Sequence, residues 1–237
     1  MITPQIHTSD LEHKDECIAF ERVSFSYQGG DNILKNLSFS LKQGSLNFVT
    51  GPSGAGKTSL LKLMYLHMRP KSGQINVFGQ NTGMLDLLQI PPLKRRMGVV
   101  LQDFSLVDHL NVFENIVLPL RVTATPRADY VQDAISLLQW VGLGDHMAAM
   151  PETLSGGQAQ RAAIARAIIS KPDILIADEP TGNVDHNIGQ RLIRLFVELN
   201  RLGTTVIIAT HDTKLIPADA TILRLNNGTL LQERMQS

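Results

Sequence analysis

An apolar run, a glycine-rich turn and an amphipathic segment follow one another in "LNFVTGPSGAGKTSLLKLMYL", and this stretch limits the fold more than any other. Gly51, Gly54 and Gly56 let backbone amides turn inward on a phosphate group without a side chain in the way. Lys57 is expected to reach the β and γ phosphates of a nucleotide, and the Thr58 hydroxyl to ligate Mg²⁺. In this strand-turn-helix context an ordinary glycine-rich turn is a poor explanation. The predicted nucleotide site comprises Gly51, Pro52, Ser53, Gly54, Ala55, Gly56, Lys57, Thr58 and Ser59.

An acidic pair follows a second apolar run, in "ILIADEPTGNVD". Asp178 would lie at the carboxyl end of a buried strand, where open α/β sheets bind their ligands. We expect Asp178 to hold the Mg²⁺ shell, and Glu179 to orient and deprotonate the attacking water. His211 follows "TVIIAT" and could donate to the γ phosphate, whereas Gln102 follows "GVVL" and could contact Mg²⁺ or water. Taken singly, His211 is explained better by a structural role and Gln102 by that of a plain loop residue.

The remaining pattern is that of an α/β protein, because short β-rich runs alternate with amphipathic segments. The runs "LNFVT", "GVVL", "ILIAD" and "TVIIAT" suit strands buried on both faces of a mainly parallel sheet. By contrast, "CIAFERVSFSY" alternates apolar and polar residues, which is typical of a half-exposed antiparallel strand in an N-terminal β part. Asn227-Gly228 between two alternating runs predicts a hairpin near the end of the chain.

Helical patterning replaces strands between about residues 103 and 166. Asn111 and Glu114 form the pattern of a capping box before "VFENIVLPL". The segment "ADYVQDAISLLQWVGLG" places its apolar residues on one face and ends at Gly142. We predict a helical lobe at about 103–166, inserted in the sheet core of one domain spanning residues 17–237. A polar extension, residues 1–16, precedes this domain.

A second anion-ready helix start lies far along the chain, in "LSGGQ". Ser155 and Gly157 would present a hydroxyl and a free amide at the positive end of a helix. Within one protomer, the phosphate loop, Mg²⁺ and the sheet edge already surround a γ phosphate. We therefore expect this segment to face the nucleotide of a second copy, in a head-to-tail homodimer that buries two ATP molecules. The alternative is a simple helix cap. The segment comprises Ser155, Gly156, Gly157 and Gln158.

Composition excludes several other classes. The 22 Lys and Arg residues equal the 22 Asp and Glu residues, so no overall basic field indicates nucleic-acid binding. Cys17 is the only cysteine, and "MITPQIHTSDLEHKDE" lacks the apolar core of a secretory signal. The apolar runs are far shorter than the roughly 20 residues that span a bilayer. We expect a cytoplasmic protein that reaches a membrane only through a partner.

The phosphate loop, Gln102, "LSGGQ", "ILIADE" and His211 occur in an order and spacing that resembles the ATP-binding cassette of ABC proteins. The resemblance extends from about Cys17 to Gln232. It implies a two-lobe fold, an ATP-dependent head-to-tail dimer, and hydrolysis on Glu179. It also implies that Tyr27 stacks on adenine, although a strand-end aromatic explains Tyr27 equally well. Asp185 matches the family's carboxylate that communicates across the dimer.

A narrower resemblance concerns the partner. The stretches "MGVVLQDFSLVDHLNVFENIVLPLRV" and "ADEPTGNVD" resemble the FtsE group of this family, cell-division ATPases that pair with the membrane protein FtsX. This resemblance implies that dimer closure pulls on an FtsX-like partner at the cytoplasmic face of the inner membrane, and so regulates cell-wall hydrolysis. Ala159 and Leu101 depart from residues common in relatives. The candidate contact for the partner's coupling helix is a groove formed by Phe104, Leu106, Val107 and Leu110, which could instead be core residues of the lobe.

Two other functions are consistent with parts of this pattern. The sequence "ADEPTGN" also occurs in ATPase subunits of lipoprotein-release and macrolide-efflux transporters. A soluble ABC switch in translation or DNA repair is disfavoured, because the chain has one cassette and no heptad tract. A nucleoside kinase or GTPase would leave "LSGGQ" unexplained and lacks a base-reading Asn-Lys-x-Asp segment.

Overall fold

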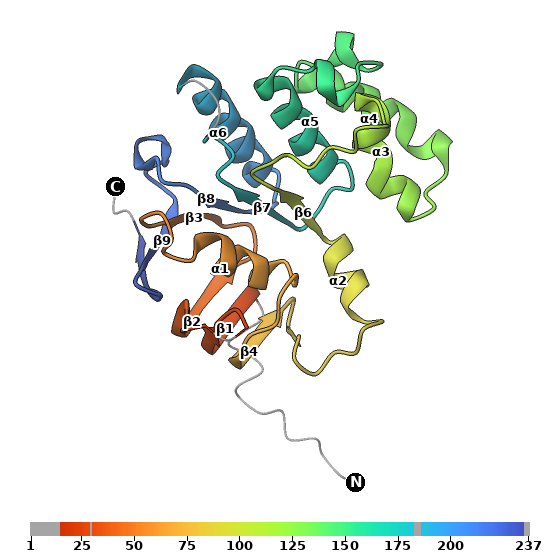
Figure 1. Cartoon of the computed structure of the whole chain (residues 1–237). Helices are drawn as coiled ribbons and strands as arrows, with labels where there is room; N and C mark the ends of the chain where they lie inside the picture. The colour runs from red at the N-terminus through yellow and green to blue at the C-terminus, as the bar shows by residue number, and fades with distance from the viewer. Residues whose placement is uncertain (1–14, 29, 183–185, 235–237) are drawn as a thin grey trace.

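The computed structural model describes residues 15–28, 30–182 and 186–234. The chain forms two β-sheets (Figure 1). The antiparallel sheet has the order β2-β1-β4-β5. Its strands are β1 (Glu16–Phe25), β2 (Leu34–Lys42), β4 (Ser72–Val77) and β5 (Gln80–Asn81).

The second sheet has the order β10-β9-β3-β8-β7-β6, and the strands from β9 to β6 in that order are parallel. They are β3 (Leu46–Thr50), β6 (Met97–Val100), β7 (Ile174–Asp178), β8 (Thr205–Ala209) and β9 (Thr221–Asn226). The antiparallel edge strand β10 (Thr229–Arg234) follows a tight turn in which Asn227 and Gly228 both have positive φ. The predicted fold class and the predicted hairpin are confirmed.

β1 is more buried than its alternating sequence indicated. It pairs with β2 on one side and β4 on the other, and Cys17 to Phe20 are all buried in succession. The half exposure expected for this strand is therefore wrong, because a central strand also buries residues on its second face, whereas the expected antiparallel pairing is confirmed. The strand begins at Glu16, so this residue belongs to the sheet, and residues 1–14 of the expected extension lie outside the described residues.

Helix α1 (Lys57–Met64) packs between the two sheets, and α6 (His186–Arg201) and α5 (Gly156–Ile168) cover the opposite face of the parallel sheet. Successive strand residues point to alternate faces. In β7, Ile174 and Ile176 join α1 and the antiparallel sheet, whereas Leu175 and Ala177 join α5 and α6. Burial on both faces explains why these strands are apolar throughout.

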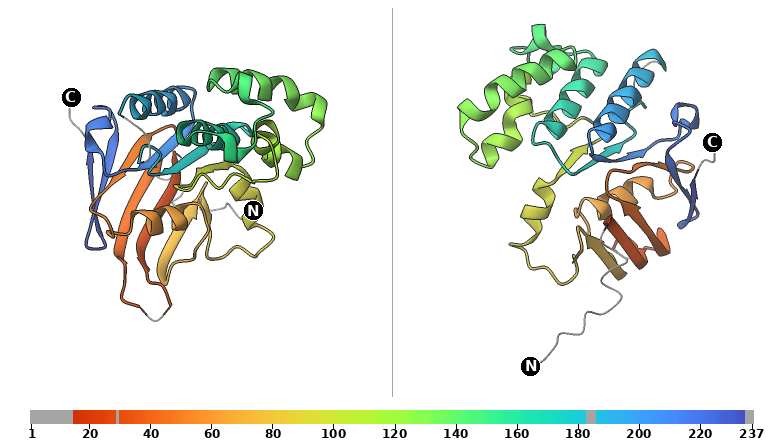
Figure 2. Two further views of the ribbon diagram at one scale, coloured as in Figure 1. Left: turned by 45° about the horizontal axis from the view of Figure 1, so that its top comes forward. Right: turned by 180° about the vertical axis from the view of Figure 1, so that it is seen from behind.

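Three helices form a lobe to one side of the sheets (Figure 2): α3 (Val112–Val122), α4 (Arg127–Trp140) and α5. The lobe has a hydrophobic cluster of its own, in which Ile116, Ala134 and Ala165 are fully buried. The expected capping box is present, since Asn111 accepts from the Glu114 amide and Glu114 accepts from the Asn111 amide. Short helices complete the chain: α2 (Ile90–Arg95), η2 (Gly144–His146), η3 (Pro151–Thr153) and η4 (Thr213–Leu215). Within the described residues, none of the helices has the length and apolar character needed to cross a membrane.

Candidate functional site

The turn between β3 and α1 requires glycine at specific positions. Gly51 has φ 151°, and a Cβ atom there would lie 2.2 Å from the Leu225 carbonyl oxygen. Gly56 has φ 100°, and its Cβ would lie 3.0 Å from side-chain atoms of Ile33 and Leu34. L-residues with side chains rarely adopt such backbone angles. The glycines therefore let the loop pass close to β9 at Gly51 and close to the start of β2 at Gly56.

Helix α1 begins without a side-chain cap. Its N-cap residue is Gly56, and no acidic residue occupies the first turn. The first amides of a helix have no partner within the helix and carry its positive end. An uncapped start beneath a glycine-rich turn is therefore suited to an anion. Lys57 reinforces this charge: its Nζ lies 3.0 Å from the Gly51 oxygen and 3.3 Å from the Pro52 oxygen, and the residue is buried.

Asp178 ends β7 and is 7% exposed. Its Oδ1 has no hydrogen-bond partner among the described residues. Burial raises the pKa of the Asp178 carboxyl, while a hydrogen bond from the Thr58 side chain opposes the rise. A buried carboxylate with a free oxygen beside a hydroxyl is the kind of donor set that Mg²⁺ prefers. These residues fit a magnesium ion, which would neutralise charge on a bound triphosphate.

Glu179 is held on both sides. One oxygen, Oε2, lies 2.7 Å from Nδ1 of His211 and accepts from the His211 amide at 3.3 Å. The other, Oε1, lies 3.5 Å from Nζ of Lys57. Glu179 also has φ 49°, an uncommon backbone conformation for a residue with a side chain. Such strain is found where surrounding structure fixes a side chain for function, and here the hydrogen bond from its amide to Ala209 helps to hold it.

These residues surround one cavity of about 440 Å³. The carboxyl ends of β7 and β8 supply Glu179 and His211, the loop after β6 supplies Gln102, and the phosphate loop lies opposite. Nine of the predicted residues, from four separate motifs, line this cavity, whereas Gly51, Pro52, Ala55 and Asp178 do not. The lining residues are Ile33, Ser53, Gly54, Gly56, Lys57, Thr58, Ser59, Gln102, Glu179, Gly182 and His211.

Tyr27 lies beside this cavity without lining it. Its hydroxyl is 3.2 Å from the Ser59 hydroxyl, and its ring meets Phe25 edge to face at 5.1 Å. The residue is 43% exposed. Both expected roles, adenine stacking and a strand-end aromatic, are compatible with this position. Asp185 lies outside the described residues.

The start of α5 is built differently from the start of α1. Ser155 accepts from the Gln158 amide at 3.3 Å, and the Gln158 side chain accepts from the Ser155 amide at 2.8 Å. The amides of Gly156 and Gly157 have no acceptor among the described residues. Ser155 and Gly156 are exposed, Gly157 and Gln158 are half-buried, and none of the four lines the nucleotide cavity of its own chain. The structure therefore leaves this helix start open to a group from outside the protomer.

Several residues near the starts of α1 and α5 were not predicted as site residues from the sequence. Ile33 lines the cavity from the loop before β2, far from any motif. His146 lies 2.8 Å from the Gln158 side-chain nitrogen and orients the capping box. Gln160 is buried, and neither of its side-chain amide atoms has a partner among the described residues. The only sequence signal for Gln160 is its position two residues after "LSGGQ".

Comparison with known proteins gives a consistent result. The sequence pattern described as "ABC transporter" matches residues 34–182. The cell division ATP-binding protein FtsE of Escherichia coli K12 is 41% identical over 214 residues, which cover 90% of this chain and 96% of the relative. FtsE of Bacillus subtilis is 34% identical over 217 residues, covering 91% and 95%.

Solved structures agree. The ATP-binding cassette MJ0796, in a dimeric post-hydrolysis state bound to ADP and Pi, is similar with a TM-score of 0.84 and 30% identity. The match covers 93% of this chain and 99% of that one. A second dimeric structure of the same cassette gives a TM-score of 0.85 with 31% identity, and equal coverage.

Proposed function

The chain belongs to the ABC transporter family of ATP-binding cassettes and is an FtsE-like ATPase, and from that premise we propose that it works on a membrane partner in cell division. The observation that carries the proposal is the single cavity that unites Lys57, Gln102, Glu179 and His211. In this proposal ATP binding joins two copies head to tail, hydrolysis separates them, and the partner transmits the motion across the membrane.

Glu179 would serve as the base that positions the attacking water. In the structure one of its oxygens is paired with Lys57 at 3.5 Å. A γ phosphate carries more charge than a carboxylate and would compete for Lys57. Its arrival would free Oε1 of Glu179 for water, while the contact with His211 keeps the carboxylate in place. The water then attacks the γ phosphorus in line with the leaving oxygen.

Thr58, Asp178 and Gln102 would hold Mg²⁺ beside the phosphates. The free Oδ1 of Asp178 supports this assignment, because a buried carboxylate oxygen without a partner is costly unless a cation joins it. Gln102 is exposed on the cavity wall and would complete the shell or bind water.

A second protomer would complete the site. The dimeric state of the similar cassette supports this proposal, as does the exposure of the α5 start. Ser155, Gly156 and Gly157 would donate to the γ phosphate bound by the other chain. The cap at Ser155 uses the hydroxyl oxygen as an acceptor, which leaves its hydrogen free to donate.

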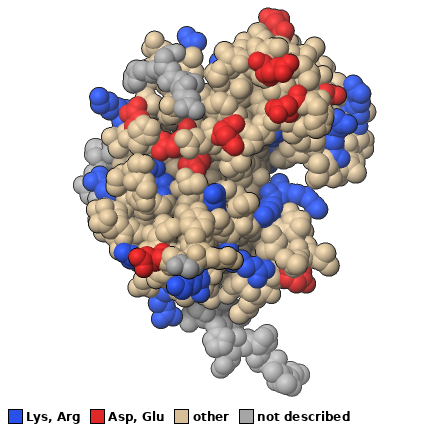
Figure 3. Space-filling view, viewed as in Figure 1, with Lys and Arg blue, Asp and Glu red and all other residues tan. Residues whose placement is uncertain are grey.

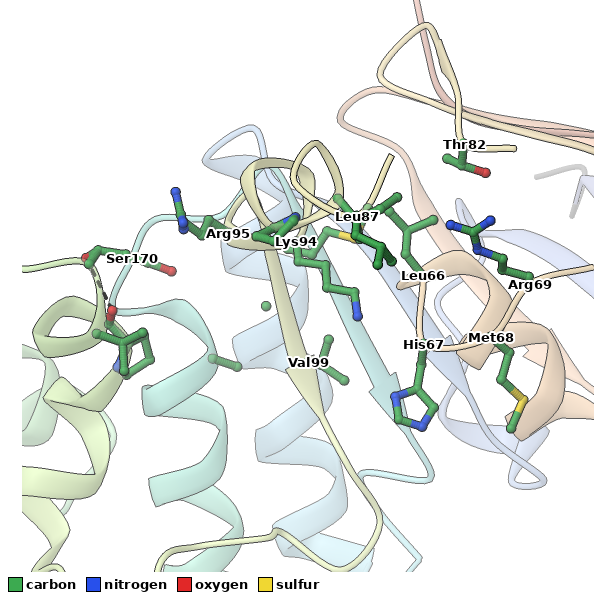
Figure 4. A pocket seen from close by; sticks show the side chains of 18 of the residues that line it. Leu66, His67, Met68, Arg69, Thr82, Leu87, Lys94, Arg95, Val99 and Ser170 are labelled. Carbon is green, nitrogen blue, oxygen red and sulfur yellow. Dashed lines mark hydrogen bonds between the residues drawn. The ribbon is translucent and has the colours of Figure 1, made fainter. Parts of the chain in front are cut away.

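The membrane partner would dock in a groove between the sheets and the helical lobe. This cavity of about 1090 Å³ is bounded by α2, β6, α3 and the end of α5. Its lining includes Arg69, Lys94, Arg95 and Arg166 but no carboxylate. Figure 3 shows basic side chains in the indentation beside the lobe, and in Figure 4 Lys94 extends toward His67 across the hollow. In a chain with no net charge, this asymmetry favours an acidic, partly apolar helix.

The four residues expected to form the docking groove lie elsewhere. Phe104 and Leu106 pack against the sheet core, and the Asn115 side chain bonds to the backbone of Val107 and Leu110. All four are half-buried, and none lines the larger groove. Arg166 links the two regions, since its guanidinium donates to the carbonyls of Phe104 and Ser105. In our proposal this segment supports the groove from behind and does not receive the partner.

The experiment is recruitment to the membrane by an FtsX-type protein from the same organism. Lys94→Glu with Arg95→Glu reverses two exposed charges of the groove, and Lys42→Glu on β2 is the matched control. Each variant is checked for folding by a thermal melt and for ATP binding. We expect the double variant to lose membrane recovery by about tenfold, equivalent to about 1.4 kcal/mol, while the control is recovered normally. Equal recovery of both variants contradicts the groove, and no recruitment of the unmodified chain contradicts the cell-division role and favours a transporter permease as partner.

A further inference from the structure

A second groove lies at the opposite end of the parallel sheet from the nucleotide cavity. It is bounded by the ends of α4, α5 and α6 and has a volume of about 730 Å³. Pro172 and Asp173 line it just before β7, and Thr204 just before β8, whereas the nucleotide cavity lies after those strands. This groove therefore has no part in the chemistry proposed above.

The groove presents large apolar side chains to solvent. Trp140 at the end of α4 is 51% exposed, and Leu202 after α6 is 82% exposed. Leu137, Ile168 and Leu199 form the wall between them. The charged groups at the rim are already paired: Lys171 lies 3.1 Å from Asp133, and Asp173 lies 2.7 Å from Arg96. The site thus favours an apolar segment over a charged ligand.

The described chain begins beside this groove. The Asp15 carbonyl accepts from the Gln43 amide at 2.8 Å. The next residue, Gly44, donates to the Thr205 hydroxyl and accepts from the Asn200 side chain, both at 2.9 Å. The same Asn200 side chain donates to the carbonyl of Thr204, which lines the groove. Residues 1–14 therefore join the described chain at Asp15. Hydrogen bonds through Gln43, Gly44 and Asn200 connect this point to Thr204 at the edge of the groove.

We propose that residues 1–14, "MITPQIHTSDLEHK", occupy this groove and place apolar side chains against Trp140 and Leu202. Fourteen extended residues span up to roughly 46 Å, which is ample to cross it. The segment supplies Ile2, Ile6 and Leu11, separated by polar residues that would face solvent. So placed, it joins the helical lobe to the sheet core at the end remote from ATP.

Trp140 makes the proposal directly testable, because it is the only tryptophan in the chain. Its fluorescence and its quenching by acrylamide are measured in the full chain and in a variant lacking residues 2–14. The deletion leaves Asp15 and β1 intact, and a thermal melt with ATP binding checks its fold. A covering segment excludes the quencher for most of the time, so the full chain should show an emission maximum at shorter wavelength and a quenching constant at least about twofold lower.

A second substitution separates covering from an indirect effect. Leu202→Asp should raise the quenching of Trp140 in the full chain and change it little in the deletion variant, because only the former has a segment to displace. Leu231→Asp on β10, also at an exposed leucine, is the control and should leave quenching unchanged in both. Equal quenching of the full and shortened chains overturns the proposal. Protection that grows with protein concentration also overturns it, and assigns the groove to a second copy.

Discussion

Two helices of this protein begin at glycine-containing turns, yet their N-termini are prepared differently. The start of α1 has no side-chain cap, lies on the wall of a cavity and is joined by a buried lysine. The start of α5 is closed by a reciprocal pair of hydrogen bonds between Ser155 and Gln158 and is exposed. The first arrangement needs an anion to satisfy it, whereas the second is stable in the separate protomer. The difference supports our proposal that α1 holds ATP and that α5 meets ATP only when another chain brings it.

The largest expected effect concerns the carboxylate on the α1 side. Glu179→Gln should keep ATP binding, because the phosphate loop and the proposed Mg²⁺ ligands are unchanged. Hydrolysis should fall by roughly 10² to 10⁴, the usual cost of losing a general base. The variant should accumulate as an ATP-bound dimer on size-exclusion chromatography. Turnover within a few-fold of the unmodified protein would mean that Glu179 does not position the water.

A smaller effect distinguishes the glycines of the two turns. Gly51→Ala places a Cβ atom 2.2 Å from the Leu225 oxygen at a positive φ, so it should reduce the free energy of unfolding by roughly 2–4 kcal/mol. Gly156→Ala meets no atom within 4 Å and should change stability by less than about 1 kcal/mol, in the favourable direction. Urea unfolding of both variants measures the difference. Equal loss of stability in both would contradict the contrast between the turns.

The third effect is electrostatic and concerns the nucleotide-free protein. Burial raises the pKa of the Asp178 carboxyl in the folded protein above its unfolded value of 3.8. The fold therefore loses stability as the pH rises from 3.8 to the folded pKa, and the full cost is present above the folded pKa. Asp178→Asn carries no charge and should stabilise the nucleotide-free protein by about 1 kcal/mol at pH 7. The advantage should disappear near pH 4, where the carboxyl is protonated.

Thermal melts at several pH values, without nucleotide or Mg²⁺, measure this effect. Asp178→Glu is the control that keeps the charge. If Asp178→Asn melts below the unmodified protein at pH 7, the carboxylate stabilises the nucleotide-free fold and the assignment of its free oxygen to a cation loses its basis.

The features of the fold that could be predicted from the sequence are those that depend on a local pattern of residues. The strand runs, the Asn111 capping box and the Asn227-Gly228 hairpin are all present, because each depends on residues close together in the chain. The pairing of Lys57 with Glu179 was not foreseen, since the two residues lie in separate motifs and no local pattern specifies that they come into contact. The burial of β1 was underestimated because it depends on its neighbours, β2 and β4. The groove between the sheets and the helical lobe, lined by Arg69, Lys94, Arg95 and Arg166, was not predicted. Its walls come from four separate segments that share no motif.

The central claim is that α5 of one chain acts on the nucleotide of another, and mixing two inactive variants tests it most directly. Lys57→Ala removes the phosphate-binding lysine, and Ser155→Arg places a bulky cation at the proposed interface. In a mixed dimer, one site pairs the intact phosphate loop of the Ser155→Arg chain with the intact Ser155 of the other chain. Random mixing in equal amounts makes half of the dimers mixed, each with one good site of two, so ATP hydrolysis should recover to about a quarter of the unmodified rate. Normal hydrolysis by Ser155→Arg alone, or no recovery in a mixture shown to form dimers, would contradict the claim.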